Sequence, residues 1–380
     1  MKKVVLAFDS FKGSASSEDI GKSAMYGVKS VFPNADVTIV PIADGGEGTT
    51  QAICKRIPST NIEIKVKDPL MRPIKASYNI TDNDIAVIEM ATASGLPLVE
   101  PKLRNPELTT TFGTGELIEN ALDKGCRKFI IGIGGSATND AATGLLSALG
   151  YRFLDKDGNV LEPIGGNLIY VDKIDDSNVD SRVKDSKFTV ACDVNNPFYG
   201  PQGAAFIYAR QKGATNSQIE ELDEGLRNFA KVIEKYSGKD VSQMPGAGAA
   251  GGMGGALYAI LGAKLEAGIN VVLDTVHFKE IIKDADLILT GEGRIDGQTK
   301  MGKALNGVLD YARPLNIPVI GIGGSIEDAK ELDKTGFTSV FCIQQGAVSL
   351  EEAMNRENAL DNVKTTVRQI MLTINRFYKK

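Results

Sequence analysis

The sequence holds few of the side chains on which many enzymes and metal sites depend. His277 is its one histidine, so any catalytic or metal scheme that needs two histidines is excluded. The 4 cysteines lie far apart and form no C-x-x-C pair, which fits a reducing cytoplasm. The 43 lysines and arginines face 48 aspartates and glutamates, and the formal net charge of −5 argues against nucleic acid or an anionic membrane as the main partner.

Long apolar runs are also missing. Lys2 and Lys3 precede only five apolar residues, 4–8, which are too few for a secretory signal. The longest run without charge, 241–263, contains Pro245 and seven glycines, so it indicates a glycine loop that leads into a helix and not a membrane span. We therefore expect a cytoplasmic chain that spans no membrane.

Glycine, in contrast, is frequent, with 41 among 380 residues, and implies many tight turns or many loops that approach a ligand closely. At about 150 residues per domain, this length suggests two domains. Short β-branched runs alternate with helical patterns, which is typical of an α/β fold with a parallel sheet covered by helices.

Both ends of the chain predict strands of one sheet. We expect residues 1–60 and 281–380 to form one flavodoxin-like parallel-sheet domain, discontinuous in sequence. Its first helix has Ser16 as N-cap and Asp19 at the third helical position. The expected strands are Lys3–Phe8, Val37–Ile42, Asp286–Thr290, Pro318–Ile322 and Ser339–Ile343.

The middle of the chain, residues 61–280, predicts an inserted mixed α/β domain, and we expect the active site in the cleft between the two domains. Closely spaced strands around a hairpin tip at 79–84 predict antiparallel pairing. Further along, the patterns predict a helix near 139–149, a surface excursion at 155–187, and a long helix from Ser217, boxed by Glu220, to Gly238.

One hexapeptide occurs twice. The sequence IGIGGS stands at 131–136 and again at 320–325. Each copy follows a β-branched run and precedes a helical pattern, which indicates two strand–turn–helix units that share the same turn. A full duplication of the chain is not visible around them.

Loops that combine glycine with charge close the strands of the expected flavodoxin-like sheet. Ser10, Lys12 and Gly13 separate the first strand from the first helix, where free N–H groups and the helix dipole favour an anion. The second loop, 43–49, holds Asp44 and Glu47 among glycines, which would suit Mg²⁺ because this ion takes oxygen ligands.

The third loop, 291–297, again combines glycines with charged residues. Arg294 is suited to bidentate binding of a carboxylate or phosphate, and Glu292 and Asp296 are suited to a metal ion. Because the carboxyl ends of parallel strands form the ligand crevice of such a sheet, we expect the three loops to belong to one site. Ordinary solvated turns are the alternative for each loop taken alone.

The inserted domain adds loops at 132–137, 193–197 and 246–252. Peptide N–H groups without a side chain in the way can surround a polyphosphate, although close helix packing explains the glycines of the third loop equally well. Asp193 ends a strand and precedes an Asn-Pro pair that restricts the local backbone, so it is the preferred general base; a turn residue is the alternative.

Other motifs favour other functions. Gly132-x-Gly134-x-x-Ala137, with Asp155 eighteen residues later, fits the dinucleotide fingerprint, so an NAD(P)-linked oxidoreductase is an alternative. Residues 297–303 come close to a P-loop, but Ala304 replaces the Ser or Thr that would bind magnesium, and a Walker-type ATPase is rejected.

Clustered acids, isolated basic residues and phosphate-binding loops suit phosphoryl transfer better than acyl transfer. Phosphoryl transfer needs little covalent chemistry from the protein, which must position the acceptor, neutralise the phosphates and orient the hydroxyl group. Two domains that close over the reactants would also exclude water, as a kinase requires.

Long segments of the chain closely resemble the type 1 glycerate kinase family. The match runs in order along nearly the whole chain, so it is far more specific than a lone glycine motif. The resembling segments are FDSFKG at 8–13, PIADGGEGT at 41–49, IGGSATND at 133–140, ACDV at 191–194, NP at 196–197, GP at 200–201, GAA at 203–205, PGAGAAGG at 245–252 and TGEGRIDGQT at 290–299.

The resemblance implies ATP-dependent phosphorylation of D-glycerate, with ATP and Mg²⁺, in the breakdown of glyoxylate, glycolate or sugar acids. It also implies a flavodoxin-like domain with a second α/β domain. Bacterial members of the family look like producers of 2-phospho-D-glycerate, whereas the residues themselves leave the 2- and 3-hydroxyl open. A non-catalytic sugar-acid binding protein is a further alternative. We expect a monomer or homodimer whose partners are these small molecules.

Roles for individual residues are hypotheses. Lys12 and Arg294 would bind the glycerate carboxylate or the transferring phosphate, and Asp193 would act as base. Metal would be held by Asp44, Glu292 and Asp296. The expected substrate- and phosphate-binding residues are Asp9, Ser10, Gly45, Gly46, Gly134, Gly135, Ser136, Asn139, Gly248, Gly251, Gly252, Gly291 and Gly293.

Overall fold

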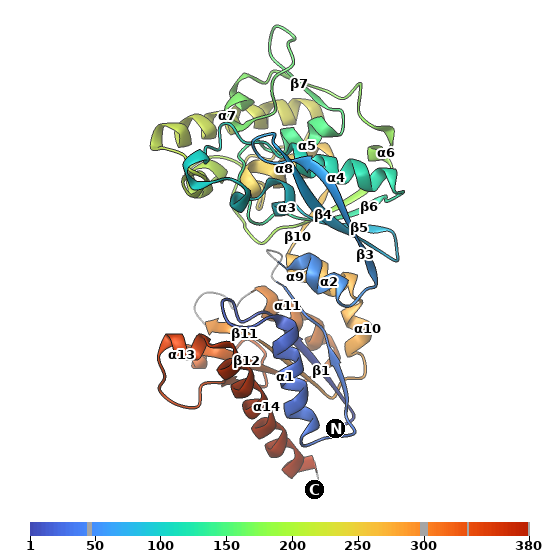
Figure 1. Ribbon diagram of the computed structural model, residues 1–380, viewed down its shortest axis with the longest axis vertical. Coiled ribbons are helices and arrows are strands. Elements are labelled where there is room, and N and C mark those ends of the chain that lie inside the picture. Colours follow the sequence, from blue (N-terminus) through green and yellow to red (C-terminus); the bar gives the residue numbers. More distant parts are fainter. Residues whose placement is uncertain (44–47, 297–302, 333, 379–380) are drawn as a thin grey trace. The chain divides into compact units, whose positions relative to one another are not determined.

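The computed structural model of the chain describes residues 1–43, 48–296, 303–332 and 334–378 (Figure 1). They form two compact units. Unit 1 comprises Met1–Asp44, Gln51–Arg56 and Val272–Lys380, and unit 2 comprises Gly45–Thr50 and Ile57–Val271. Both units are mixed α/β structures built on sheets with parallel strands, which confirms the predicted fold class. None of the described helices is long and apolar enough to cross a membrane.

Unit 1 contains a five-stranded sheet in the order β13-β12-β11-β1-β2, and all of its neighbouring strands pair in parallel. Numbered within the unit from the β2 edge, this order is 2-1-3-4-5, the order of flavodoxin-like sheets. Strands from both chain ends therefore form one sheet, as predicted. The strands are β1 (Lys3–Phe8), β2 (Asp36–Ile39), β11 (Leu287–Asp296), β12 (Val319–Glu327) and β13 (Ser339–Cys342).

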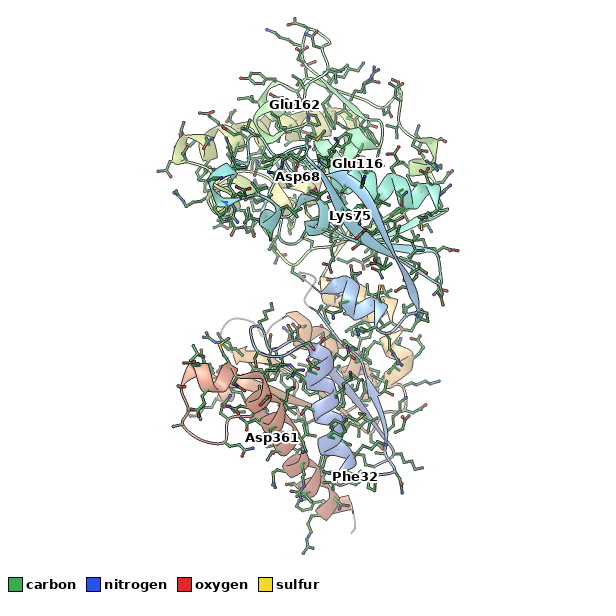
Figure 2. All side chains as sticks on the ribbon, in the orientation of Figure 1. Phe32, Asp68, Lys75, Glu116, Glu162 and Asp361 are labelled. Carbon is green, nitrogen blue, oxygen red and sulfur yellow. The ribbon has the colours of Figure 1, made fainter. Side chains whose placement is uncertain are left out.

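One face of this sheet is covered by helices α1 (Ser17–Lys29) and α14 (Arg356–Tyr378), which lie side by side (Figure 1). Helix α1 begins where the sequence predicts, because Ser16 Oγ accepts a hydrogen bond from the N–H of Asp19 at 3.2 Å. Of the residues labelled in Figure 2, Phe32 packs against this core, whereas Asp361 on α14 is exposed. The other helices of unit 1 are α10 (Phe278–Ile282), α11 (Lys303–Ala312), α12 (Ala329–Leu332) and α13 (Leu350–Met354).

Strands β11 and β12 are longer than predicted, which corrects two expectations. Residues 291–296 are not a loop but the continuation of β11, and they pair with β12 as far as Asp296 opposite Glu327. The second copy of the hexapeptide, 320–325, likewise lies inside β12 and forms no turn. Glycine explains the extension, because a Cβ at Gly291 would lie 1.9 Å from the Ile322 carbonyl oxygen.

Unit 2 contains a six-stranded sheet in the order β10-β9-β6-β5-β4-β3. The pairs β3–β4 and β4–β5 are antiparallel, which confirms the predicted hairpin, and the remaining pairs are parallel. The strands are β3 (Ser59–Lys67), β4 (Pro73–Thr81), β5 (Ile85–Glu89), β6 (Lys128–Gly132), β9 (Lys187–Ala191) and β10 (Lys264–Glu266); β7 (Arg152–Leu154) and β8 (Lys173–Asp175) form a separate antiparallel pair.

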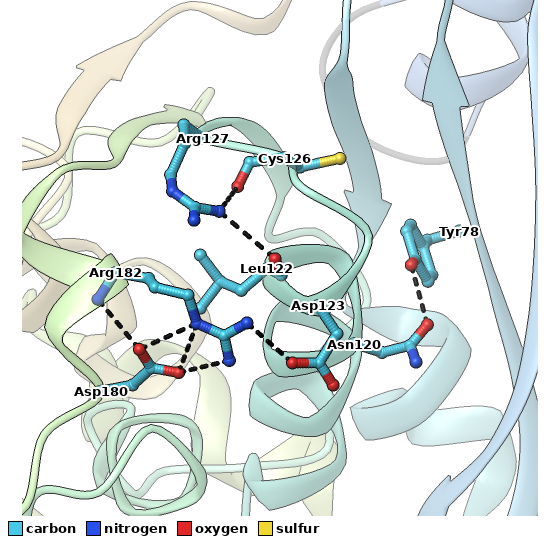
Figure 3. Close-up of polar contacts among 8 residues, drawn as sticks. All are labelled: Tyr78, Asn120, Leu122, Asp123, Cys126, Arg127, Asp180 and Arg182. Carbon is cyan, nitrogen blue, oxygen red and sulfur yellow. Dashed lines mark hydrogen bonds and ion pairs between the residues drawn. The ribbon is translucent and has the colours of Figure 1, made fainter.

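The helices of unit 2 are α3 (Ala91–Ser94), α4 (Phe112–Asp123), α5 (Thr143–Ala148), α6 (Ser181–Lys184), α7 (Asn216–Ser237) and α8 (Ala249–Ile260), while α2 (Thr49–Cys54) and α9 (Gly268–Thr275) contain unit boundaries. Figure 3 shows two polar ties of α4. The hydroxyl of Tyr78 on β4 donates to Asn120 at 2.9 Å, and Arg182 on α6 bridges Asp180 and Asp123, the latter at 2.8 Å. These contacts fix α4 between the sheet and α6.

Three predictions for unit 2 need correction. The long helix is capped by Thr215, not Ser217, and Gln218 completes a capping box two residues earlier than expected. Helix α5 starts at Thr143 instead of 139, because Ala141 and Ala142 adopt left-handed φ values of +47° and +62°. The segment 155–187 is not only a surface excursion, since it supplies β8, α6 and the buried side chain of Leu168.

Candidate active site

Unit 1 has a pocket of about 730 Å³ at the carboxyl ends of β1, β11 and β12. The side chains of Asp9, Lys12 and Arg294 line it together with Ser10, and its apolar wall comes from residues 343–354. The order of the sheet changes direction between β1 and β11, and ligands of open α/β sheets bind at such a point. Of the predicted site residues, the structure gathers Asp9, Ser10, Lys12, Glu292, Gly293 and Arg294 around this pocket.

Strand β11 determines how its charged residues are displayed. Glu292, Arg294 and Asp296 alternate along the strand, so they share one face, whereas Ile295 is fully buried on the other. Arg294 is exposed and pairs with Glu327 of β12 at 2.7 Å, which raises the pKa of the guanidinium and keeps it charged. Asp296 lies beyond the residues that line the pocket, and Gly291 accepts a hydrogen bond from the N–H of Asp9 at 2.9 Å.

The turn after β1 presents Lys12 by burying the residues beside it. Phe11 is 3% exposed and exchanges hydrogen bonds with Ala15 at 2.9 and 3.0 Å, which closes the turn. Lys12 and Gly13 are left exposed at its tip, with Gly13 at a φ of +78° that favours glycine. Asp9 is nearly buried, and its carboxylate accepts the N–H of Ser10 at 2.6 Å.

In unit 2 the turn after β6 lies at the corresponding edge of the sheet. Ser136 pairs with Gly95, and the N–H of Ala137 donates to the Ser94 carbonyl oxygen at 2.9 Å. Gly134 and Gly135 are exposed at the tip of the turn. Ser136 is 8% exposed and Asn139 is fully buried. The predicted residues of this loop therefore divide into an exposed pair and a buried pair.

Asp193 follows the next strand of this sheet, β9. It is partly exposed, and its Oδ1 accepts the N–H of Gly268 at 3.3 Å. Gly268 is the first residue of α9, which follows β10. Asp193 therefore lies at the neighbouring carboxyl ends of the parallel strands β9 and β10. Asn196, a little further on, is held by the Tyr208 hydroxyl at 2.6 Å. The other carboxylate oxygen of Asp193, Oδ2, is buried.

The glycines of the 246–252 loop are packed into unit 2. A Cβ at Gly248 would lie 2.2 Å from the Pro197 carbonyl oxygen, and one at Gly251 would lie 2.2 Å from that of Thr138. Gly251 and Gly252 also have φ values of +70° and +92°. Packing and backbone conformation therefore account for glycine here, and phosphate binding by these residues stays a prediction.

A buried polar network that the sequence patterns did not predict lies beneath the turn. Asp140 is fully buried, and its Oδ2 accepts hydrogen bonds from the N–H and hydroxyl of Thr111 and from the N–H of Gly144, at 2.8, 2.8 and 3.1 Å. Burial raises the pKa of the Asp140 carboxyl, and these donors oppose that effect. The only signal in the sequence is the position of Asp140 within the resembling segment 133–140.

Lys212 was missed as well. Its side chain is 2% exposed, and its Nζ donates to Ser136 Oγ at 2.8 Å and to the Thr138 carbonyl oxygen at 2.6 Å. Burial lowers the pKa of Lys212 to about 7, although the negative charge of Asp140 opposes the shift. In the sequence Lys212 ends a polar run, Arg210-Gln-Lys212, which looks like exposed helix, so no local signal reveals it.

The predicted metal ligands are only partly described. Asp44, like Gly45 and Gly46 of the same loop, lies outside the described residues. Among the residues that the structure describes, no three His, Cys, Asp or Glu side chains are grouped so that they could hold a metal ion. Glu292 and Asp296 lie on one face of β11 and are partly exposed, and their carboxylate oxygens are of the type that Mg²⁺ prefers.

The geometry of the turn after β6 does not support the dinucleotide fingerprint. Such a motif requires the glycine loop to open a helix directly, but α5 begins at Thr143, well after Ala137. Asp155, the expected ribose ligand, is partly exposed and accepts hydrogen bonds from the N–H groups of Asp157 and Asn159 in its own turn. The oxidoreductase alternative therefore lacks the structural context it needs.

Comparison with known proteins gives a consistent answer. The chain matches the glycerate kinase family over residues 4–375. A glycerate kinase of Bacillus subtilis strain 168 is 47% identical, covering 98% of this chain and 97% of its own. The glycerate 2-kinase of Escherichia coli K12 is 44% identical, covering 98% of both chains. The crystal structure of a protein from Salmonella typhimurium LT2, described as a glycerate kinase 2, has a TM-score of 0.89 at 42% identity and covers 100% of both chains.

These matches extend over nearly all of both units, including the pocket of unit 1 and the turn after β6 in unit 2. The resemblance inferred from the glycine-rich segments is thus confirmed. The chain is therefore an enzyme, a kinase, of the glycerate kinase family.

Proposed function

We propose that this kinase transfers the γ-phosphoryl group of ATP to the 2-hydroxyl of D-glycerate and releases ADP and 2-phospho-D-glycerate. The main support is the pocket of unit 1, which Asp9, Lys12 and Arg294 line at the carboxyl edge of a flavodoxin-like sheet. Small anions with hydroxyl groups suit such a mixture of charges. The 2-position is favoured because the E. coli relative is named a glycerate 2-kinase.

Lys12 and Arg294 bind the carboxylate of glycerate or the phosphoryl group in this proposal. Arg294 has a planar fork of donors that matches either anion, and its partner Glu327 is exposed, so exchanging that partner for a substrate anion costs little. Lys12 is held at the tip of a closed turn and contributes a point charge.

Asp193 acts as the general base. The attacking hydroxyl oxygen forms a bond to the γ-phosphorus while the bond from this phosphorus to the bridging oxygen of ADP breaks, and the hydroxyl proton passes to the Asp193 carboxylate. Asp193 is proposed for this role because it follows β9 at the carboxyl edge of the sheet. The proton leaves with solvent after the product departs.

Magnesium fits this reaction, with Glu292 and Asp296 of β11 and Asp44 as its proposed ligands. When bound, Mg²⁺ neutralises phosphate charge. The two carboxylates of β11 lie four residues apart on one strand face, which places them along the same side of the sheet. We also propose that the enzyme is cytoplasmic, since all four of its cysteines are free thiols.

The product of the reaction tests the proposal. The enzyme is incubated with D-glycerate, ATP and MgCl₂, and the new phosphate ester is observed by phosphorus NMR without proton decoupling. We expect a doublet, because the phosphorus of 2-phosphoglycerate couples to one carbon-bound proton. A triplet would show transfer to the 3-hydroxyl, and absence of both ADP and ester would refute kinase activity on this substrate.

The variant Asp193→Asn tests the base. We expect kcat to fall by about 100-fold or more, because the amide cannot accept the proton, while the KM values change little. Asp155→Asn is the control, since Asp155 is a partly exposed turn residue of the same unit. A loss smaller than about tenfold for Asp193→Asn, equal to roughly 1.4 kcal/mol, would exclude the role of base.

A further inference from the structure

The turn formed by residues 134–136, after β6, combines exposed peptide groups with a buried side chain. Gly134 and Gly135 are exposed, and Gly135 has a φ of +73°. Within the described part of the chain, the N–H groups of Gly134, Gly135 and Ser136 donate to no acceptor. Peptide N–H groups at the carboxyl end of a parallel strand, next to a residue with positive φ, favour an oxyanion.

Lys212 contacts this turn from inside the unit. Its ammonium nitrogen lies 2.8 Å from Ser136 Oγ and 2.6 Å from the Thr138 carbonyl oxygen, so it holds both ends of the buried half of the loop. Ser136 is thus placed between the buried lysine and the exposed glycines. Because the hydroxyl of serine both donates and accepts, it can accept from Lys212 and donate to a ligand at the tip.

The charge of Lys212 is poorly compensated without a ligand. Asp140 is the acidic group that acts on it. The Asp140 Oδ2 atom accepts three hydrogen bonds from Thr111 and Gly144, and the buried Oδ1 atom accepts none from the described residues, so the ammonium is bonded to Ser136 and Thr138 and not to a carboxylate. Two arginines lie near Lys212, Arg210 in the chain and Arg104 beside Gly213, but each has a hydrogen-bond partner of its own. The Nε of Arg104 donates to the Val99 carbonyl oxygen, and Arg210 donates to Asn216. Burying an ammonium group costs desolvation free energy, and apolar packing often stabilises a loop equally well.

We propose that Lys212 supplies the positive charge of an oxyanion site at the 134–136 turn and acts on the ligand through Ser136. The inference rests on the proposed function, which provides the two candidate ligands, the carboxylate of D-glycerate and a phosphate of the nucleotide. Lys212 is a positioning residue in this arrangement, because Ser136 and the peptide N–H groups make the contact. The site differs from the pocket of unit 1, which contains neither residue.

Binding of an anion then has a predictable pH dependence. Without ligand the pKa of Lys212 is about 7, and a bound negative charge favours the ammonium and raises this pKa. Below pH 7 the lysine is protonated in both states, so affinity is at its maximum and constant. Above pH 7 binding takes up a proton, and Kd rises up to about tenfold per pH unit until the pKa of the complex is reached.

Calorimetry on the full-length enzyme tests this coupling without turnover. D-glycerate and ADP are titrated separately at pH 6 and pH 8, in two buffers with different enthalpies of ionisation. For the ligand that binds at the turn, we expect the observed enthalpy to depend on the buffer at pH 8, as uptake of close to one proton requires. For D-glycerate, whose carboxylate is ionised at both pH values, it should be independent of the buffer at pH 6. The arm that shows this dependence identifies the anion as carboxylate or phosphate.

Lys212→Met assigns the proton. The variant should lose the buffer dependence at pH 8 and bind that ligand about tenfold more weakly at pH 6. Lys239→Met is the matched control, because Lys239 also donates to a carbonyl oxygen, that of Tyr258, but contacts no part of the turn. If Lys212→Met does not fold, Ser136→Ala keeps the lysine and removes the link, and should weaken the same ligand.

Two results would overturn the inference. One is an enthalpy that is independent of the buffer at pH 8 for both ligands, and the other is proton uptake that persists in Lys212→Met. Neither result touches the proposed function, which is judged by the phosphorus NMR of the product. Conversely, proton uptake on binding would support the site even if the NMR showed the 3-phosphate.

Discussion

In unit 1 the turn after β1 and strand β11 carry exposed charged side chains, whereas in unit 2 the turn after β6 covers charged side chains that are buried. Lys12 and Arg294 stand at the surface on a turn and on an extended strand, and Arg294 is 62% exposed. In unit 2 the surface of the turn consists of glycines, and the charged side chains of Asp140 and Lys212 lie beneath it with exposures of 0% and 2%.

The difference separates exposed charges, which can serve a ligand without supporting the fold, from buried charges on which the fold also depends. Exposed charges interact weakly in water and can exchange partners, so unit 1 offers binding groups that contribute little to stability. The buried network of unit 2 cannot lose a partner without leaving polar groups unsatisfied. We therefore expect substitutions of the exposed charges of unit 1 to change activity but not stability, and substitutions in the buried network of unit 2 to lower the stability of the fold.

The strongest test of this comparison is Asp140→Ala. The variant leaves the N–H and hydroxyl of Thr111 and the N–H of Gly144 without an acceptor inside the core. It also removes the negative charge that acts on the buried ammonium of Lys212. We expect it to lower the free energy of unfolding by about 3–5 kcal/mol. Denaturant titration followed by circular dichroism measures this change.

Asp155→Ala is the control for this change. Asp155 also accepts backbone N–H groups, at 2.8 and 2.9 Å, but in an exposed turn of unit 2 where water can replace it. We expect a loss of about 1 kcal/mol or less. Equal losses in the two variants would show that burial of the network is not what matters.

The positions of the strands of unit 1 were predictable because β-branched runs and their glycine ends mark each strand locally. The lengths of β11 and β12 were not, since residues 292–296 continue β11 by pairing with residues 323–327 of β12. Glycine and charge in one segment resemble a loop when the partner strand is unknown. The cap at Thr215 was missed for a simpler reason, because Ser217 with Glu220 offers an equally good local pattern.

Gly251→Ala provides the second test and addresses the backbone beneath the turn. A methyl group would lie 2.2 Å from the Thr138 carbonyl oxygen and 2.5 Å from Asn139 Cα, at a φ of +70°. We expect a loss of about 3 kcal/mol in the free energy of unfolding, because both strain and overlap must be relieved. Thermal or denaturant unfolding of the variant measures it.

Gly238→Ala isolates the overlap. Gly238 has nearly the same φ, +71°, at the end of α7, but open space surrounds the place of its Cβ. This variant should lose only the conformational cost, about 1–2 kcal/mol. If both glycines gave the same loss, packing of the 246–252 loop against the turn would not explain its glycines, and the prediction that it binds phosphate would gain support.

Local patterns located the candidate site better than they explained it. The strand ends marked Lys12, Asp193 and the 134–136 turn, because glycine beside a polar residue after an apolar run is visible in one sequence. Lys212 could not be found in this way, since its partners Ser136 and Thr138 are more than 70 residues away and its own segment looks exposed. Buried charges are a tertiary property, so the structure was needed to find the one on which the further inference depends.

The smallest expected effect on stability belongs to the charge pair of unit 1. Glu327→Gln removes the partner of Arg294, but both side chains are at least half exposed, so the free energy of unfolding should change by less than about 0.5 kcal/mol. Arg294→Ala should be equally mild for folding and yet raise the KM for D-glycerate or ATP about tenfold, because a bidentate contact to an anion is lost. Arg313→Ala, which breaks an equally exposed pair with Asp310, should change neither quantity. A destabilisation of several kcal/mol by Glu327→Gln would place this pair with the buried network of unit 2 and end the contrast between the two edges.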